Sequence, residues 1–209
     1  MAFSLRPGEN LYVAAIDATT GFLSEYSRLP ELTELAAAMH VDVGKLSSLF
    51  GNQGRLAEAV AENAMMLLHD RCIRSVVQVQ DQDPLRQLQA LSEGFLEWAY
   101  CHPREFQLIG LMPANQFEGV RGLLRYEQAL HDLMLKLYGR AHRAGMVQGN
   151  DDPAMLVAIA HTFAYGVASK MLLGDLSRWA PDSNPLEGAR ATMRVFMRRM
   201  LGVPGKAAT

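Results

Sequence analysis

The segment that most constrains this chain is LTELAAAMHVDVGKLSSLFGNQGRL, which spans residues 32–56. Its apolar residues recur at helical spacing in two short runs, and a third run follows. Asp42, between the first two runs, is typical of a helix N-cap whose carboxylate accepts from backbone N–H groups two or three residues later. Two short helices joined by a tight turn form a helix-turn-helix, which places its second helix in a DNA groove. The segment therefore predicts a DNA-binding element, with Leu46, Leu49 and Phe50 as the buried face of that second helix.

The composition is that of an ordinary globular chain, with 209 residues, 49% of them hydrophobic and 20% charged. A net charge of −2 provides no overall attraction to nucleic acid or to an anionic membrane. The N-terminus lacks an apolar signal core, and no uncharged run of 18 apolar residues is present. We therefore expect a cytoplasmic protein with no membrane partner, whose two cysteines stay reduced.

The pattern is helical almost throughout, so we expect an all-α fold with about nine helices. Helix starts are marked by Pro30, Asp42 and Asp152, and breaks by the residues around 81–84, 145–151 and 175–185. The longer helices are expected over about residues 9–25, 54–80, 117–144, 152–174 and 186–201, with one more ending near residue 100 and a shorter one over about residues 104–111.

At this level of detail the chain resembles the tetracycline-repressor (TetR) family of bacterial transcriptional regulators. The resemblance is carried by these residues: Glu34-Leu35-Ala36, Val41, Asp42, Gly44, Leu46, Phe50 and Leu56. It implies a helix-turn-helix DNA-binding domain over residues 1–53 and a helical ligand-binding and dimerisation domain over residues 54–209. It also implies three partners, namely a double-stranded DNA operator, a small-molecule effector, and a second copy bound through the last two helices.

Several positions depart from the pattern of that family. His40 replaces the usual turn glycine, Asp42 replaces a Ser or Thr cap, and Gln53 replaces a lysine that contacts phosphate. Ser47 and Leu49 stand where Tyr and His are common. Residues 1–60 also contain four basic and seven acidic side chains, whereas a basic surface is the expected footprint of a DNA-binding module.

The candidate DNA contacts lie in and around the second helix of the motif. Lys45, Ser47 and Ser48 are placed to reach bases or phosphate; the alternative is a solvated helix face. Val43 and Gly44 lie where the backbone approaches DNA, and Val43 could touch a thymine methyl group. The remaining candidates, expected to contact phosphate, are Asn52, Gln53, Arg55 and Thr33. The alternative for Asn52 is a plain N-cap, and the alternative for Thr33 is an inert surface position.

The later helices are rich in methionine and aromatic residues, which either line a cavity for an apolar ligand or simply pack in the core. The resemblance favours a ligand pocket. Its candidate residues are Met65, Met66, Phe95, Trp98, Phe106, Met112 and Phe117, with His161 and Tyr165 as polar groups one helical turn apart, unless these two are satisfied core or interface residues. The helix over residues 152–174 is apolar nearly all round, so a partner copy is expected to cover one side of it.

The sequence gives little support for an enzyme. Its histidines and cysteines do not have the spacing of a zinc site or of a nucleophile–base pair, and no phosphate-binding glycine loop is present. We therefore expect no metal, no cofactor and no enzymatic activity, an all-helical enzyme being the third hypothesis. The leading hypothesis is a homodimeric transcriptional repressor released by a small apolar molecule. The second is a small-molecule binding protein on the same scaffold whose DNA-binding head is weakened or lost.

Overall fold

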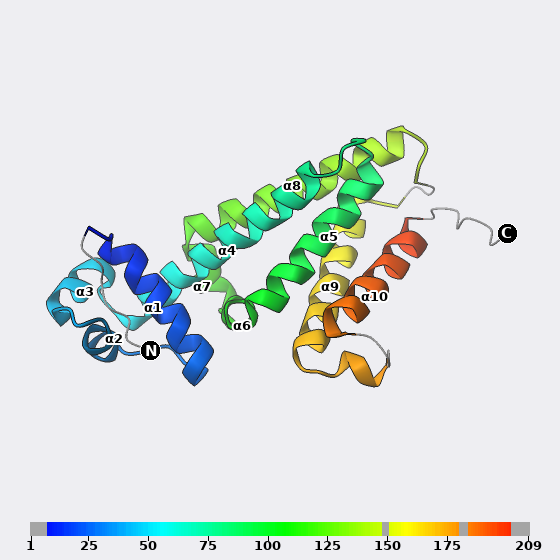
Figure 1. Cartoon of the computed structure of the whole chain (residues 1–209). Helices are drawn as coiled ribbons and strands as arrows, with labels where there is room; N and C mark the ends of the chain where they lie inside the picture. The colour runs from blue at the N-terminus through cyan, green and yellow to red at the C-terminus, as the bar shows by residue number, and fades with distance from the viewer. Residues whose placement is uncertain (1–7, 148–150, 180–183, 202–209) are drawn as a thin grey trace. The chain divides into compact units, whose positions relative to one another are not determined.

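A computed structural model describes residues 8–147, 151–179 and 184–201 and confirms the expected all-α fold, since these residues contain helices and no strands (Figure 1). The helices are α1 (Leu11–Tyr26), α2 (Leu32–Met39), α3 (Val43–Phe50), α4 (Gln53–Val77), α5 (Pro84–Cys101), α6 (Pro103–Leu111), α7 (Ala114–Gly119), α8 (Arg121–Arg143), α9 (Pro153–Leu172) and α10 (Pro185–Met200), with a 3-10 turn η1 (Leu176–Arg178).

The described residues thus hold ten α-helices, because the helix expected over residues 117–144 is divided into α7 and α8. Val120 separates the two with an extended backbone. Gly119 and Gly122 flank it, and glycine has a low helix propensity. A side chain at Gly122 would also overlap that of Glu62 on α4, so the start of α8 packs closely against α4. Pro30, expected in the first turn of α2, lies just before its N-cap, Glu31.

The chain divides into two compact units. Unit 1 comprises Met1–Met66 with His102–Leu124, and unit 2 comprises Leu67–Cys101 with Arg125–Thr209. In unit 1, α6 packs against α1, so this unit holds more than the helix-turn-helix itself. The functional division into residues 1–53 and 54–209 stays a prediction.

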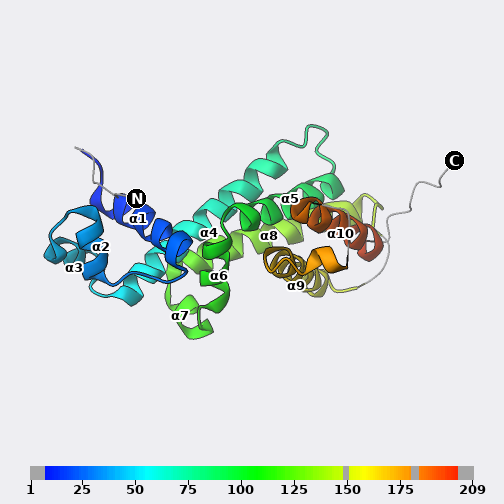
Figure 2. The same ribbon diagram turned by 60° about the horizontal axis from the view of Figure 1, so that its bottom comes forward.

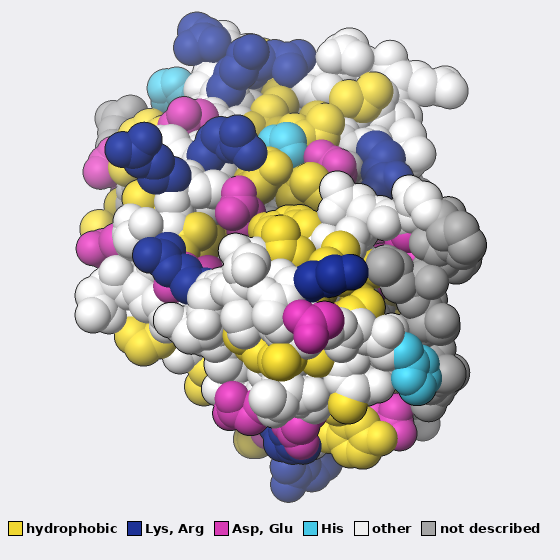
Figure 3. Space-filling view, turned by 90° about the vertical axis from the view of Figure 1, so that its left-hand side faces the viewer, with side chains coloured by type: hydrophobic (Ala, Val, Ile, Leu, Met, Phe, Trp, Pro, Cys, Tyr) yellow, Lys and Arg dark blue, Asp and Glu magenta, His cyan; other side chains and the backbone are white. Residues whose placement is uncertain are grey.

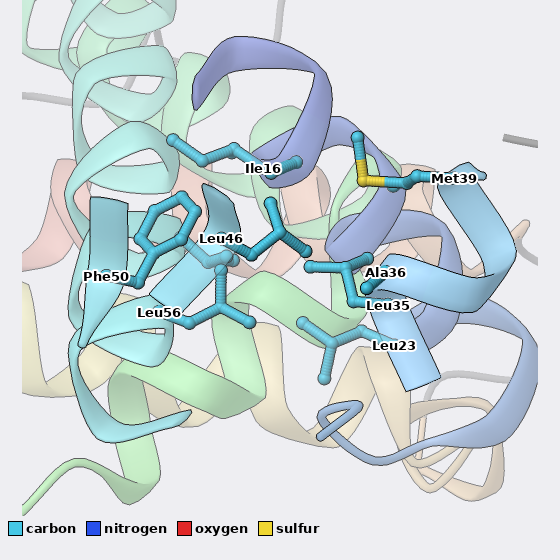
Figure 4. Close-up of a cluster of buried hydrophobic side chains, with 11 residues drawn as sticks. Ile16, Leu23, Leu35, Ala36, Met39, Leu46, Phe50 and Leu56 are labelled. Atoms are coloured by element: carbon cyan, nitrogen blue, oxygen red, sulfur yellow. The ribbon is translucent and has the colours of Figure 1, made fainter. Parts of the chain in front are cut away.

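Unit 1 is held together by a core to which the first four helices contribute (Figure 4). In the close-up, side chains from all four helices point toward one another: Ile16 and Leu23 of α1, Leu35, Ala36 and Met39 of α2, Leu46 and Phe50 of α3, and Leu56 of α4. The apolar positions that suggested a helix-turn-helix in the sequence are therefore mostly the positions that bury its inner surface.

The turn between α2 and α3 has the backbone that the family pattern requires, although a histidine occupies the glycine position. His40 has a φ of 56°, in the left-handed region, and its N–H caps the carbonyls of Ala36 and Ala37. Asp42 is the N-cap of α3, but its carboxylate accepts no capping hydrogen bond. That part of the prediction was wrong: Asp42 Oδ1 lies beside Gly44, where a Cβ on that residue would meet it at 2.8 Å, but it accepts no hydrogen bond from the first turn of α3.

In unit 2, α5 packs against α9 and α10, and the last two helices lie side by side (Figure 2). The rings of Phe163 on α9 and Phe196 on α10 stack with centroids 3.8 Å apart. Glu97 of α5 forms ion pairs with Arg71 on α4 and with Arg190 on α10. Unit 2 therefore joins its helices by both apolar packing and paired charges.

Candidate nucleic-acid interface

Helix α3 buries one side and exposes the other. Leu46 and Phe50, four residues apart, are buried in the core of unit 1. Every other residue of the helix is exposed: Val43, Gly44, Lys45, Ser47, Ser48 and Leu49. Leu49, which we expected to be buried, is 45% exposed, because it lies beside the stripe that Leu46 and Phe50 fill. We call these six exposed residues the outer face of α3.

The hydroxyl groups on the outer face differ in what they can still bind. Ser48 Oγ donates to the carbonyl of Gly44 at 2.8 Å, so its only proton is used and its oxygen can act only as an acceptor. Ser47 and Thr33 are exposed and make no hydrogen bond through their hydroxyls within the described part of the chain. The donors left on α3 are therefore Ser47 and Lys45.

Two of the basic side chains near α3 are paired with acids of unit 1. Arg28 makes a two-pronged hydrogen bond to Glu34, at 2.8 and 2.7 Å, and Arg55 pairs with Glu58 at 3.1 Å. The Arg28 guanidinium, helped by the Glu31 N–H, holds the pKa of Glu34 at about 2. Lys45 has no acidic partner among the residues described.

The surface on this side of the molecule reflects that pairing (Figure 3). Lys and Arg side chains gather at the top of the view, whereas lower down they mostly stand singly beside acidic or apolar ones. With Arg28 and Arg55 paired to acids, electrostatic attraction of unit 1 to DNA would rely on few unpaired cations.

At the start of α4, two of the predicted phosphate contacts also have structural roles. Asn52 Oδ1 accepts from the N–H of Arg55 at 2.9 Å, so Asn52 caps this helix. Gln53 Nε2 donates to the carbonyls of Leu29 and Pro30, at 3.4 and 3.3 Å. Gln53 therefore ties the loop before α2 to the start of α4, a role that sequence reasoning missed because the partners lie more than 20 residues away.

A polar hollow of about 290 Å³ lies beside these residues in unit 1. It is lined by Asn52, Gly54, Arg55, Glu58, Asn115, Gln116 and Gly119. Gln116 Nε2 donates to Glu58 at 3.4 Å, which places α7 against the start of α4. The α7 residues were not among the predicted contacts, because no local pattern connects them with a helix some 60 residues earlier.

The residues predicted to line an apolar ligand pocket fall into both units. Unit 1 holds Met65 and Phe106, which are buried, and Met66, Met112 and Phe117, which are half-buried. Unit 2 holds Trp98, which is buried, Phe95, which is half-buried, and His161 and Tyr165, which are exposed on α9. Because the nine residues divide between the units, their convergence on one pocket stays a prediction.

Helix α9 has an uncovered apolar side. Leu156, Val157 and Val167 are buried within unit 2, whereas Met155 and Ile159 are 58% and 43% exposed. Among the described helices, α9 is the one that is long and apolar enough to cross a membrane by length and composition alone. A helix that packs against its own unit on one side and against a partner on the other is apolar on both sides, so the composition of α9 does not require a membrane.

The described residues contain no cluster of side chains suited to metal binding. No group of three His, Cys, Asp or Glu side chains there could hold a metal ion. Cys72 and Cys101 are both free thiols, and burial raises the pKa of Cys72 to about 12.

No family model matches the sequence, and no curated protein matches it. Solved structures do share the fold. A protein with unknown function from Rhodococcus sp. RHA1 is 20% identical with a TM-score of 0.77, over 92% of this chain and 96% of that one. A TetR-like transcriptional regulator from the same organism is 16% identical with a TM-score of 0.66, over 92% and 94%.

The ketosteroid transcriptional regulator KstR2 of Mycobacterium tuberculosis is 14% identical with a TM-score of 0.64, over 95% of this chain and 97% of that one. At these identities the likeness concerns the fold alone. The chain has the all-helical fold of TetR-family transcriptional regulators, with a helix-turn-helix followed by a helical C-terminal part.

Proposed function

We propose that the protein is a homodimeric DNA-binding transcriptional regulator of the cytoplasm, a repressor released by a small apolar molecule. The observation that carries this proposal is the outer face of α3, which projects from a core closed by Leu46 and Phe50. Each subunit would place this helix in a major groove, in half-sites about one helical turn apart or a multiple of it. Other predicted contacts are Thr33 and Arg55, which are exposed near α3.

A second copy is the occupant that we propose for the uncovered side of α9. Met155 and Ile159 would be buried by the same helix of the partner, with α10 beside it, in a two-fold interface. Val195 on α10, also exposed, would extend the apolar contact. This arrangement gives the two recognition helices a fixed separation, which a palindromic operator requires.

The effector would act by preferring one separation of the recognition helices over the other. A ligand with equal affinity for both arrangements shifts nothing, so the released form must bind it better. Seven of the nine predicted pocket residues are Met, Phe or Trp, which favours a mainly apolar molecule. KstR2 is a ketosteroid regulator by name, but ligands within one fold vary too much to be carried over to this chain.

The direct test is an electrophoretic mobility shift with the DNA that flanks its own gene, at salt concentrations from about 50 to 200 mM. We expect a protein–DNA complex whose affinity falls as the salt concentration rises. The Lys45→Ala variant should bind the same DNA more weakly than the wild type. Lys136→Ala is the matched control, because Lys136 is an exposed lysine of α8 in unit 2. No salt-sensitive complex at the lowest salt, with or without cell extract as a source of effector, would reject the proposal.

A second function is favoured by the state of the charges in unit 1. Arg28 and Arg55 are paired with acids, and the Gln53 amide bonds to two carbonyls instead of presenting a cation. A small-molecule binding protein with a weakened head would have these features. The double variant Gln53→Lys with Ser47→Tyr separates the two functions, since a head that binds DNA only after this change was defective.

A further inference from the structure

The polar hollow beside the start of α4 is a cavity that the function proposed above does not use. It lies within unit 1, and its volume of about 290 Å³ is close to the lower end of the range for small-molecule pockets. Two charged side chains line it, Arg55 and Glu58, together with three carboxamides and two glycines, and none of these described residues has an apolar side chain. The hollow therefore suits a small polar molecule and not the apolar effector expected among the later helices.

Several polar groups around the hollow have unused hydrogen-bonding capacity. Within the part of the chain that the structure describes, the Asn115 carboxamide makes no hydrogen bond, and Asn52 uses only its oxygen, as the cap of α4. Gln116 donates through Nε2 in a long contact of 3.4 Å to Glu58, so its oxygen is left to accept. The hollow therefore offers both donors and acceptors to a ligand.

The two charged side chains hold each other only loosely. Arg55 Nη1 lies 3.1 Å from Glu58, and the Arg55 side chain is 70% exposed whereas that of Glu58 is 20% exposed. Because an exposed ion pair contributes little to stability, Arg55 can turn toward a ligand at small cost. A ligand carboxylate on Arg55 and a ligand ammonium group on Glu58 would replace this pair by two charge-assisted interactions. A simple anion would fit less well, because Glu58 would repel it.

We propose that the hollow binds a free amino acid, with its carboxylate on Arg55 and its ammonium group on Glu58 and Gln116 Oε1. The short distance between Arg55 and Glu58 favours a ligand whose two charges are close together, as they are in an α-amino acid. Asn52 and Arg55 are also expected phosphate contacts, so the bound amino acid takes Arg55 away from DNA and lowers DNA affinity. This regulatory part rests on the function proposed above, whereas amino-acid binding itself does not.

Two-dimensional NMR of the full-length protein tests the binding without DNA. The probes are glycine, L-serine and L-glutamine; the comparison ligands are lactate, which lacks the ammonium group, ethanolamine, which lacks the carboxylate, and glycerol, which lacks both. We expect at least one amino acid to shift the amide signals of the residues that line the hollow, and each comparison ligand to bind at least about tenfold more weakly. No shift with any of the three amino acids, or equal binding of glycerol, would overturn the site.

Two variants and a control assign the binding to the hollow. Glu58→Gln removes the partner of the ammonium group and is expected to weaken amino-acid binding at least about tenfold. Asn115→Ala, which removes no hydrogen bond of the described fold, is expected to weaken it about threefold. Glu118→Gln is the control, because Glu118 is an exposed residue of α7 that does not line the hollow. Wild-type affinity in Glu58→Gln, or an equal loss in all three proteins, would overturn the assignment, with circular dichroism confirming that the helices remain.

The competition is measured with the DNA that flanks the gene. The amino acid should weaken the wild-type complex and leave the complex of the Glu58→Gln variant nearly unchanged. Undiminished DNA affinity in saturating amino acid would overturn the regulatory role and leave the binding site in place. The absence of any DNA complex would overturn the function proposed above, while the NMR titration would still decide whether the hollow binds an amino acid.

Discussion

Helices α3 and α9 both bury one side and expose the other, but the two exposed sides differ in chemistry. The outer face of α3 carries glycine, two serines, a lysine and two flanking apolar residues. The outer side of α9 carries larger apolar side chains, including Met155 and Ile159. A partner for α9 would gain mainly from apolar burial, which salt hardly weakens. A partner for α3 would gain from close fit and a few charges, so the two surfaces should respond differently to mutation and to salt.

The largest effect is expected from placing a charge on the exposed side of α9. Ile159→Glu would bury an unpaired carboxylate twice in a two-fold interface, which should weaken the dimer at least about a thousandfold. Sedimentation velocity at micromolar protein should then show monomers, where the wild type shows dimers. Leu111→Glu is the control, since Leu111 is 83% exposed in unit 1 and should leave the dimer intact. A dimeric Ile159→Glu protein would mean that α9 does not meet the partner.

A second test compares the inner and outer sides of α3 directly. Leu46→Ala should lower the free energy of unfolding by about 2–5 kcal/mol, because it opens a cavity at a fully buried position. Leu49→Ala, three residues later, should change it by no more than about 0.5 kcal/mol. Urea unfolding followed by circular dichroism, at one protein concentration, measures both. Equal losses would contradict the orientation of α3 on which the nucleic-acid interface depends.

The difference between the two sides of α3 also explains how much could be predicted from the sequence. Burial imposes a periodic apolar pattern, so Leu35, Leu46, Phe50 and Leu56 indicated the helix-turn-helix core correctly. Leu49 was misjudged because a leucine beside a buried stripe looks like part of it in a sequence. The division between α7 and α8 was missed because the low helix propensity of Gly119 and Gly122, on either side of Val120, is a weak signal within a helical pattern.

The candidate interface was less predictable than the core for a similar reason. Its residues could be placed on a helix face, but their remaining binding capacity depends on partners that no local pattern reveals. Arg55 and Gln53 were both candidate phosphate contacts, yet one pairs with Glu58 and the other bonds to the carbonyls of Leu29 and Pro30. Exposure follows from periodicity, whereas the hydrogen bonds that occupy an exposed group follow from tertiary structure.

A third test asks how far electrostatics contributes to DNA binding. Counting Lys45 and Arg55 of each head as phosphate contacts gives a slope of log K against log salt no steeper than about −4 for a dimer. Lys45→Ala should make the slope shallower by up to about 2. Filter binding or fluorescence anisotropy over a range of salt concentrations measures the slope, with Lys136→Ala unchanged. A slope steeper than about −6 would show that further cations take part and would remove the contrast with α9.

The smallest effect concerns the pairing of charges near α3, which makes the outer face so weakly basic. With the pKa of Glu34 held at about 2 by Arg28 and the Glu31 N–H, the carboxylate should stay ionised in the folded protein far below the pH at which an ordinary glutamate is protonated. Because the pKa of Glu34 is lower in the folded protein than in the unfolded chain, the ion pair stabilises the fold fully above the unfolded pKa, near 4.5. This stabilisation disappears as the pH falls toward 2.

A carboxyl NMR titration should place the Glu34 midpoint near pH 2. Arg28→Ala should raise it toward the ordinary value, whereas Arg55→Ala, which removes the other paired arginine, should not. A midpoint near pH 4 in the wild type would mean that Arg28 is available to DNA after all, and that the outer face of α3 lies in a more positive surface than its ion pairs indicate.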